Sequence, residues 1–238
     1  STGFITALSK GKTKVGFRKN PLSFLYNISF DHKIGNGEHE VERNHKLIQS
    51  FVKGNYKKPK VYPSETDYDK VKTYKGQPYI TISPSSVWFT KQYPKAKWIE
   101  FIDKVPDDFK IYLLGSQDDY KACEEIIFNS LSSKCHNLAG KLSLLQSSAL
   151  LEDAKMNYVN DSAPMHLASA TNSPVSAIFC STIPAFGFGP LSDKSFIIET
   201  EENLKCRPCG LHGKKECPIK NFKCGYNINS ESLLYNLD

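Results

Sequence analysis

The chain is organised around one stretch, Asn157-Tyr158-Val159-Asn160-Asp161-Ser162-Ala163-Pro164-Met165-His166-Leu167-Ala168. A short half-apolar run leads into polar Asn160-Asp161-Ser162, and a helix-like run follows. This order is typical of a strand, a tight turn and a helix N-terminus. In an open α/β sheet, ligands bind beyond the carboxyl end of a strand, and the first N–H groups of a helix favour an anion such as phosphate. The alternative is that Asp161 or Ser162 only caps the helix.

A repeating strand-then-helix pattern surrounds this stretch from residue 77 onward. Strands are expected at 79–83, 109–114, 175–180 and 196–198, a short strand and turn at 137–141, and helices at 94–105, 122–131 and 143–154. Such alternation predicts an α/β fold, with a Rossmann-like parallel sheet that carries helices on both faces.

The first third of the chain lacks this alternation. Residues 1–53 have a strand-like centre at 13–17 and a helix candidate at 38–53, as expected for an incomplete N-terminal domain. Residues 54–76 are rich in Lys, Tyr and Pro and are interpreted as a linker. A ligand-binding domain is expected over 77–225, followed by a helical tail at 226–238.

Composition sets broad limits on function. The 238 residues are 39% hydrophobic and 24% charged, with a formal net charge of +6. No apolar run approaches the roughly 20 residues that span a bilayer, and no signal-peptide pattern is visible, so a cytoplasmic location is expected. The mild positive charge suits a phosphorylated ligand or an anionic membrane surface, without specifying either. The lysines are scattered, which does not favour nucleic-acid binding.

Four of the seven cysteines cluster near the C-terminus: Cys206, Cys209, Cys217 and Cys224. The odd total and the lack of a secretory signal argue against a disulfide framework and favour a reducing compartment. The cluster contains a single short Cys-x-x-Cys spacing, whereas a zinc site commonly shows two. Free thiols that pack a loop are therefore favoured, and zinc is the weaker alternative.

Three polar loops follow expected strands, at residues 85–91, 115–119 and 160–166. In a parallel sheet these loops lie at one edge and can converge. Lys91 is a mobile cation suited to phosphate, and Asp119 stands where a carboxylate can accept hydrogen bonds from a ribose. Taken singly, Lys91 is more simply a surface lysine and Asp119 a helix cap. For His166 a structural role is favoured over a catalytic one.

Several well-known site patterns are absent from the sequence. It has no Gly-x-Gly-x-x-Gly and no Gly-x-x-x-x-Gly-Lys-Ser/Thr, which disfavours ordinary NAD and P-loop sites. It has no Gly-x-Ser-x-Gly elbow either.

Several motifs, in order, resemble glycosyltransferase family nine, the ADP-heptose:lipopolysaccharide heptosyltransferases. Residues 83–94 (SPSSVWFTKQYP) resemble the family's NPGASWPTKRWP loop, and residues 160–168 (NDSAPMHLA) resemble its NDSGPMHLA. Residues 137–141 (NLAGK) and 39–44 (HEVERN) also resemble family segments. The match covers about residues 14–225, and several motifs in register are more specific than one.

The resemblance implies a GT-B fold, with the nucleotide-sugar donor in the C-terminal half and the acceptor and catalytic base in the other. It implies inverting transfer of heptose from ADP-heptose to a lipid-linked saccharide of the inner core, with no added cofactor. Lys91 and Asp161 would support the leaving group and hold the heptose hydroxyls. The substrate-binding residues implied or placed in these loops are Ser85, Ser86, Thr90, Asp119, Leu142, Ser162, Ala163 and His166. Among them, Asp119 would contact the ribose and Leu142 the adenine.

Two departures from the family pattern bear on mechanism. Ala163 replaces a usual Gly and adds a methyl where the backbone should approach phosphate. The family's first strand and its Gly-rich loop, which holds an acid, have no counterpart. We therefore expect roughly 80 further residues before Ser1, judged against common domain sizes, with the catalytic base among them. The alternative is a truncated nucleotide-sugar-binding module without that base. A zinc-stabilised interaction protein is a weaker rival.

Overall fold

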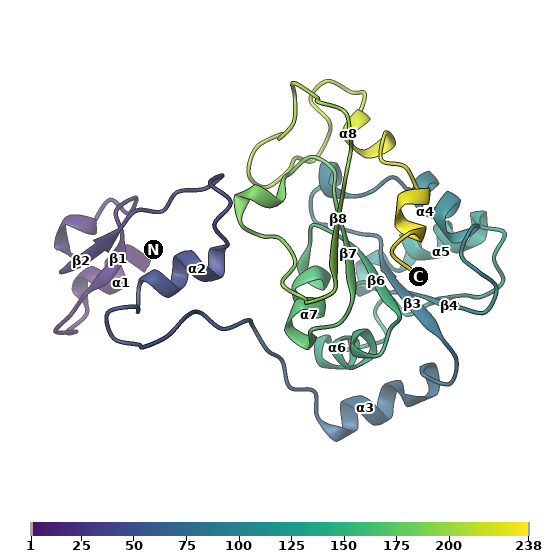
Figure 1. The fold of residues 1–238 in the computed structure, drawn as a ribbon, viewed down its shortest axis with the longest axis horizontal. Helices are drawn as coiled ribbons and strands as arrows, with labels where there is room; N and C mark the ends of the chain where they lie inside the picture. The colour runs from purple at the N-terminus through teal and green to yellow at the C-terminus, as the bar shows by residue number, and fades with distance from the viewer. Residues whose placement is uncertain (1, 238) are drawn as a thin grey trace. The chain divides into compact units, whose positions relative to one another are not determined.

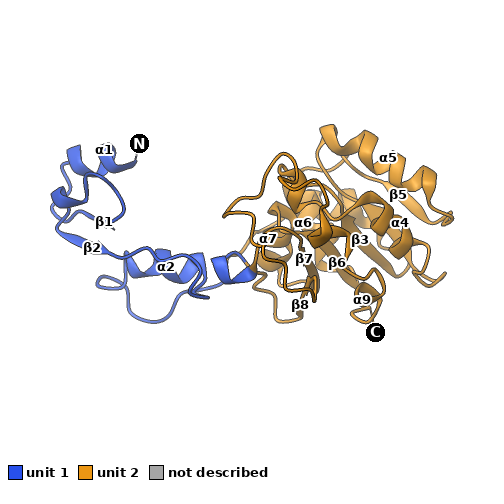
Figure 2. Ribbon diagram, turned by 90° about the horizontal axis from the view of Figure 1, so that it is seen from above, with its two compact units in different colours: residues 1–58, 184–188 blue, residues 59–183, 189–238 orange. Residues whose placement is uncertain are grey.

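The computed structural model describes residues 2–237, so the outermost residues of the predicted domain ranges, Ser1 and Asp238, lie outside it. The chain forms two compact units (Figure 2). Unit 1 runs to Lys58 and also includes Pro184–Phe188, and unit 2 comprises Pro59–Ile183 and the chain from Gly189 onward.

A six-stranded sheet forms the centre of unit 2 (Figure 1). Its strands are β3 (Tyr79–Ser83), β4 (Lys110–Leu113), β5 (Cys135–Asn137), β6 (Met156–Asn160), β7 (Val175–Phe179) and β8 (Ser195–Glu199). They lie in the order β5-β4-β3-β6-β7-β8, and every neighbouring pair is parallel. Ile80 of β3 aligns with Ile111 on one side and Met156 on the other. All residues of β3, β6 and β7 are buried, as expected for central parallel strands.

Helices cover both faces of this sheet. Helices α4 (Lys95–Ile102), α5 (Tyr120–Asn129) and α9 (Glu231–Leu234) contribute to one buried apolar cluster. Helices α3 (Glu65–Val71), α6 (Leu144–Glu152) and α7 (Ala163–Thr171) contribute to the other. Alternate strand residues point to opposite faces, so Ile80 and Ile82 join the first cluster and Tyr79 the second. The predicted Rossmann-like sheet with helices on both faces is confirmed.

The strand order places a topological switch point between β3 and β6. The chain leaves β3 through α4 towards β4, and it leaves β6 through α7 towards β7, which lies on the other side. The two connections therefore diverge, and the loops that follow β3 and β6 border a crevice at the carboxyl edge. These are the loops that carry Lys91 and Asp161.

Unit 1 holds helices α1 (Thr2–Leu8) and α2 (Glu40–Lys46), and a parallel pair of strands, β1 (Val15–Phe17) and β2 (Ile28–Phe30). Arg43 of α2 is 1% exposed and pairs with Glu40. Its guanidinium also donates to the carbonyl of Phe186 at 2.7 Å. This contact is one reason why residues 184–188 group with unit 1 although the chain on either side of them belongs to unit 2.

Three predicted segments differ from the structure. The helix expected at 38–53 is limited to α2, the predicted linker 54–76 contains α3, and unit 2 begins at Pro59. Helix α3 has a Ser64–Asp67 capping box and buries Val71. One buried residue in a Lys- and Pro-rich stretch gives little periodicity, so the sequence pattern missed it. The predicted tail 226–238 belongs to unit 2, where α9 packs against α4.

The remaining elements are short. They are α8 (Lys223–Tyr226) and the 3-10 turns η1 (Ser23–Leu25), η2 (Lys72–Tyr74), η3 (Phe89–Lys91), η4 (Gln117–Asp119) and η5 (Pro184–Phe186). Within residues 2–237, no helix combines the length and apolar character that a membrane crossing requires.

Candidate donor site at the sheet edge

Lys91 and Asp161 meet at the switch point. The Nζ atom of Lys91 lies 2.7 Å from Oδ2 of Asp161, and their side chains are 15% and 9% exposed. The hydroxyl of Thr182, which follows β7, donates to the same Oδ2 at 2.7 Å. Lys91 comes from η3, in the loop after β3, and Asp161 directly follows β6. The structure therefore brings together the two residues that the sequence singles out for catalysis.

A buried asparagine fixes the loop that carries Lys91. Asn160 is fully buried, and its side-chain N–H donates to the carbonyl of Pro84 at 2.8 Å. Its Oδ1 accepts the backbone N–H of Tyr93 at 2.9 Å. Pro84 and Tyr93 stand at the two ends of the loop, so one amide holds both ends. Within the loop, Gln92 donates to the carbonyl of Ser86, and Ser85 and Ser86 are half-buried.

The turn after β6 presents a helix N-terminus. Ser162 is the N-cap of α7 with an extended backbone, and its hydroxyl donates to the Asn160 carbonyl at 3.3 Å. Asp161 does not cap this helix, because its carboxylate is engaged by Lys91 and Thr182. The capping alternative for Asp161 is therefore wrong.

Ala163 is exposed and begins α7 in a helical conformation. Among the described residues, non-glycine positive φ angles occur only at Asn172, Lys220 and Phe222. The alanine at 163 therefore causes no backbone strain. His166 is exposed on the same helix.

The structure gives each of the remaining predicted substrate-binding residues a different environment. Asp119 accepts the backbone N–H and the hydroxyl of Ser116, both at 2.7 Å, so it does cap the helical turn before α5. Leu142 is partly buried against the core. Thr90 is 1% exposed, and its hydroxyl accepts hydrogen bonds from Ser181 and from the backbone N–H of Lys214. Its hydroxyl therefore faces protein groups, unlike that of a direct ligand contact.

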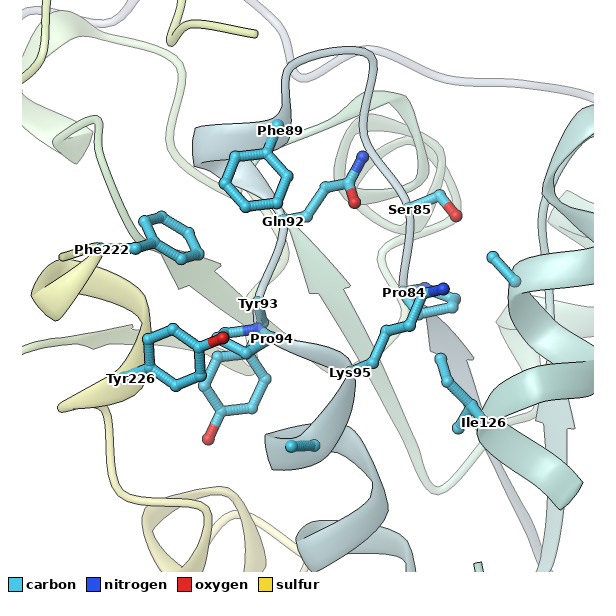
Figure 3. Close-up of a pocket in the computed structure, with 12 residues that line it drawn as sticks. Pro84, Ser85, Phe89, Gln92, Tyr93, Pro94, Lys95, Ile126, Phe222 and Tyr226 are labelled. Atoms are coloured by element: carbon cyan, nitrogen blue, oxygen red, sulfur yellow. The ribbon is translucent and has the colours of Figure 1, made fainter. Parts of the chain in front are cut away.

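A pocket of about 260 Å³ adjoins the loop after β3 (Figure 3). The aromatic rings of Phe89, Phe222 and Tyr226 lie on one side, and Lys95 and Ile126 lie on the other. Ser85 and Gln92 belong to the loop itself. The pocket can accommodate an apolar or planar group beside the candidate donor loop.

Sequence reasoning missed two parts of the site. Thr182 follows a predicted strand in the same way as Asp161, so the strand-end argument would have identified it. The segment Cys206–Lys214 gave no such signal, because its contacts to the site use mostly main-chain groups that lie far away in sequence.

The clustered cysteines are free thiols, like all seven in the chain. Within residues 2–237 no three His, Cys, Asp or Glu side chains are arranged to hold a metal ion. Burial raises the pKa of Cys224 to about 11, and the neighbouring thiols add to this shift.

Cys217 is expected to react with iodoacetamide at pH 7.5 faster than Cys209 or Cys224. Burial opposes its ionisation, but backbone N–H groups from residues 219–222 outweigh that effect and lower its pKa. Burial raises the pKa of both Cys209 and Cys224. Because the thiolate is the nucleophile, labelling of Cys217 should rise with pH and level off at a lower pH than for these two. Peptide mapping by mass spectrometry measures the order, and earlier labelling of Cys224 would contradict it.

Comparisons with known proteins show a family match over most of the chain. The profile of glycosyltransferase family 9 (heptosyltransferase) matches residues 1–221. The lipooligosaccharide heptosyltransferase 2 of Haemophilus influenzae is 34% identical over 128 residues, which cover 52% of this chain and 36% of that protein. The chain thus spans little more than a third of this curated relative.

Two solved structures share the fold. Escherichia coli ADP-heptose lps heptosyltransferase II has a TM-score of 0.73 and 24% identity, covering 95% of this chain and 69% of that one. E. coli heptosyltransferase WaaC with ADP has a TM-score of 0.60 and 19% identity, covering 92% and 61%. With the family profile matched over nearly the whole sequence, the chain belongs to glycosyltransferase family 9, the heptosyltransferase family.

Proposed function

We propose that unit 2 binds ADP-heptose and that the protein transfers the heptosyl group to the lipopolysaccharide inner core with inversion. The observation that carries this proposal is the Lys91–Asp161 pair, which places a cation and a carboxylate 2.7 Å apart at the switch point of a nucleotide-binding type of sheet. A structure with the same fold holds ADP.

The two charges suit the two ends of a nucleotide sugar. Lys91 can leave Asp161 to bind the diphosphate as a mobile cation, while the N–H groups at the start of α7, near Ser162 and Ala163, approach it from the other side. Asp161 can then accept hydrogen bonds from sugar hydroxyls. The donor would thus replace an internal ion pair with two separate sets of contacts.

The proposed reaction is a single displacement. A hydroxyl oxygen of the acceptor attacks the anomeric carbon as the bond to the β-phosphate oxygen breaks, so the configuration inverts and ADP leaves. Lys91 and the α7 N–H groups stabilise the negative charge that develops on the departing ADP. No added cofactor is required for this displacement. The acceptor proton passes to a base that we do not assign to any residue of this chain.

Neighbouring groups complete the proposed donor site. Asp119 follows β4, the strand beside β3, where its carboxylate can meet the ribose. Leu142, which follows β5, would lie against the adenine. Ser85 and Ser86 would line the sugar and phosphate side of the loop, with His166 on the exposed face of α7.

Unit 1 would form part of the acceptor-binding half, in agreement with its short parallel strand pair. The acceptor would be a lipid-linked saccharide, which would bring the protein to the cytoplasmic face of the inner membrane. The net charge of +6 favours contact with an anionic surface.

Thermal unfolding with nucleotides tests the donor assignment. ADP at about 100 times its Kd should stabilise the fold by about 2.7 kcal/mol, which corresponds to a rise in Tm of roughly 5–10 °C at this size. UDP at the same concentration should protect less. Heptosyl transfer from ADP-heptose to a purified inner-core acceptor, with the anomeric configuration read by NMR, tests the reaction. Equal protection by both nucleotides, or none, would overturn the donor assignment.

A further inference from the structure

The segment Cys206–Lys214 contacts both loops that supply the Lys91–Asp161 pair. It lies within unit 2, far from these loops in sequence. Its contacts to the site are made by Arg207, by Gly213 and by its backbone, and not by its thiols. Four sets of contacts connect this segment to the Lys91–Asp161 pair.

Arg207 gathers the chain that follows β7. Its side chain is 13% exposed and pairs with Glu199 at the end of β8. Its guanidinium donates to the carbonyls of Cys180 at 2.7 Å and Thr182 at 2.8 Å, and more distantly to that of Phe179. The planar fork of arginine suits several acceptors in fixed directions. One side chain therefore binds three carbonyls of the backbone from 179 to 182.

This stretch of backbone carries the partner of Asp161. Thr182 is 1% exposed, and its hydroxyl donates to Oδ2 of Asp161 at 2.7 Å. The backbone N–H of Cys209 also donates to the carbonyl of Ser181 at 2.8 Å. Arg207 therefore acts on the carboxylate of Asp161 through Thr182.

The other end of the segment holds the residue before Lys91. The N–H of Lys214 donates to the Thr90 hydroxyl at 2.8 Å, and the N–H of Thr90 donates to the carbonyl of Lys214 at 3.1 Å. The hydroxyl of Ser181 donates to the same Thr90 hydroxyl oxygen at 3.0 Å. Thr90 is thus fixed between the segment and the chain after β7.

Gly213 supports Lys91 itself. A methyl group at this position would lie 2.8 Å from Cγ of Lys91 and 3.1 Å from Cβ of Trp88. Both distances are shorter than normal carbon contacts. The aliphatic stem of Lys91 therefore occupies space that only a glycine leaves open.

We propose that two residues of Cys206–Lys214, Arg207 and Gly213, are positioning residues for the donor diphosphate site that align Asp161 and Lys91. The ligand in this inference rests on the proposed function. The alignment of the two side chains does not, so a separate measurement can test it.

The test uses the full chain with Gly213→Ala and Arg207→Lys, and Gly210→Ala as the matched control. Gly210 and Gly213 both have positive φ, 89° and 78°, so alanine strains the backbone at each. A methyl at 210 meets no atom within 4 Å. Arg207→Lys keeps a charge for Glu199 but not the fork that reaches the carbonyls.

Two readouts separate alignment from general stability. Titration with ADP gives affinity, and a Lys91→Met/Asp161→Asn double-mutant cycle in urea gives the coupling between the pair without any ligand. Gly213→Ala displaces Lys91 and should weaken ADP binding about tenfold, as for one misaligned charge-assisted hydrogen bond. Arg207→Lys acts on Asp161, which does not hold the diphosphate, and should leave the ADP affinity unchanged. Both variants should reduce the coupling between Lys91 and Asp161 to roughly half or less. Gly210→Ala should change neither, although it lowers the unfolding midpoint similarly to Gly213→Ala.

Equal results for Gly210→Ala and Gly213→Ala in both readouts would overturn the inference. If Arg207→Lys keeps the wild-type coupling between Lys91 and Asp161, Arg207 acts only as a charge for Glu199, and its assigned role is overturned. If the wild-type chain does not bind ADP, the proposed donor fails, and the coupling measurement alone decides whether the segment aligns the pair.

Discussion

Lys91→Met is expected to weaken ADP binding by about 10- to 150-fold. The methionine keeps most of the side chain's length and apolar stem but removes the cation, so the change isolates one charge-assisted hydrogen bond, typically about 1.5–3 kcal/mol. Isothermal titration of the two proteins with ADP measures the ratio. Lys91 is only 15% exposed, so solvent screens this charge less than it screens a surface lysine.

Asp161→Asn should separate the binding of the diphosphate from the binding of the sugar. In the free protein Asp161 neutralises Lys91, so its replacement leaves the cation available, and ADP should bind as tightly as before or more tightly. The sugar hydroxyls lose their carboxylate acceptor, so any advantage of ADP-heptose over ADP should disappear. The transfer rate should fall by about 100-fold, since about 3 kcal/mol of transition-state stabilisation is lost.

Lys104→Met serves as the matched control. Lys104 also pairs with a carboxylate, that of Glu231, at 2.7 Å, but it follows α4 at the opposite edge of the sheet. Its removal changes the net charge by the same amount and should leave the ADP affinity unchanged. Equal losses in Lys91→Met and Lys104→Met would mean that only the overall charge attracts ADP. Weaker ADP binding by Asp161→Asn would contradict the assignment of Asp161 to the sugar.

The sequence was a good guide to the sheet because central parallel strands need continuous apolar runs. The runs at 79–83, 109–114 and 175–180 correspond to β3, β4 and β7. Polar residues that follow such strands meet at one edge, so the sequence could bring Lys91 and Asp161 together before any coordinates were known.

The parts of the structure that the sequence did not predict depend on contacts that leave no pattern in the order of residue types. Arg43 reaches the carbonyl of Phe186, 143 residues away, and a main-chain acceptor leaves no mark on residue type. The same holds for Arg207 and the carbonyls after β7. Helix α3 was missed because it buries only Val71. A helix cap and a ribose contact would use the same carboxylate of Asp119 in the same loop. The sequence therefore does not distinguish these two roles.

Asn160→Leu should be the most damaging single change to the donor loop. The leucine side chain has a similar volume but makes no hydrogen bonds. The carbonyl of Pro84 and the N–H of Tyr93 are therefore left buried without the Asn160 amide as their partner. At about 1–3 kcal/mol for each unsatisfied group, the unfolding free energy should fall by roughly 3 kcal/mol. Both ends of the loop would be released, so Lys91 would lose its fixed position and ADP affinity should fall by at least tenfold, measured well below the unfolding transition.

Asn157 provides the internal comparison, because it lies on the same strand and is equally buried. Its side chain bonds to Leu151, Pro174 and Thr81, all remote from the carboxyl edge. Asn157→Leu should therefore cost a similar unfolding free energy in urea while leaving the ADP affinity of the folded protein intact. If both variants lose stability and affinity in parallel, Asn160 contributes only to the core. The two variants differ only in which end of β6 has lost its hydrogen bonds. If Asn160→Leu alone loses ADP affinity, the Asn160 side chain, which bonds Pro84 and Tyr93, is what holds Lys91 in position for the diphosphate.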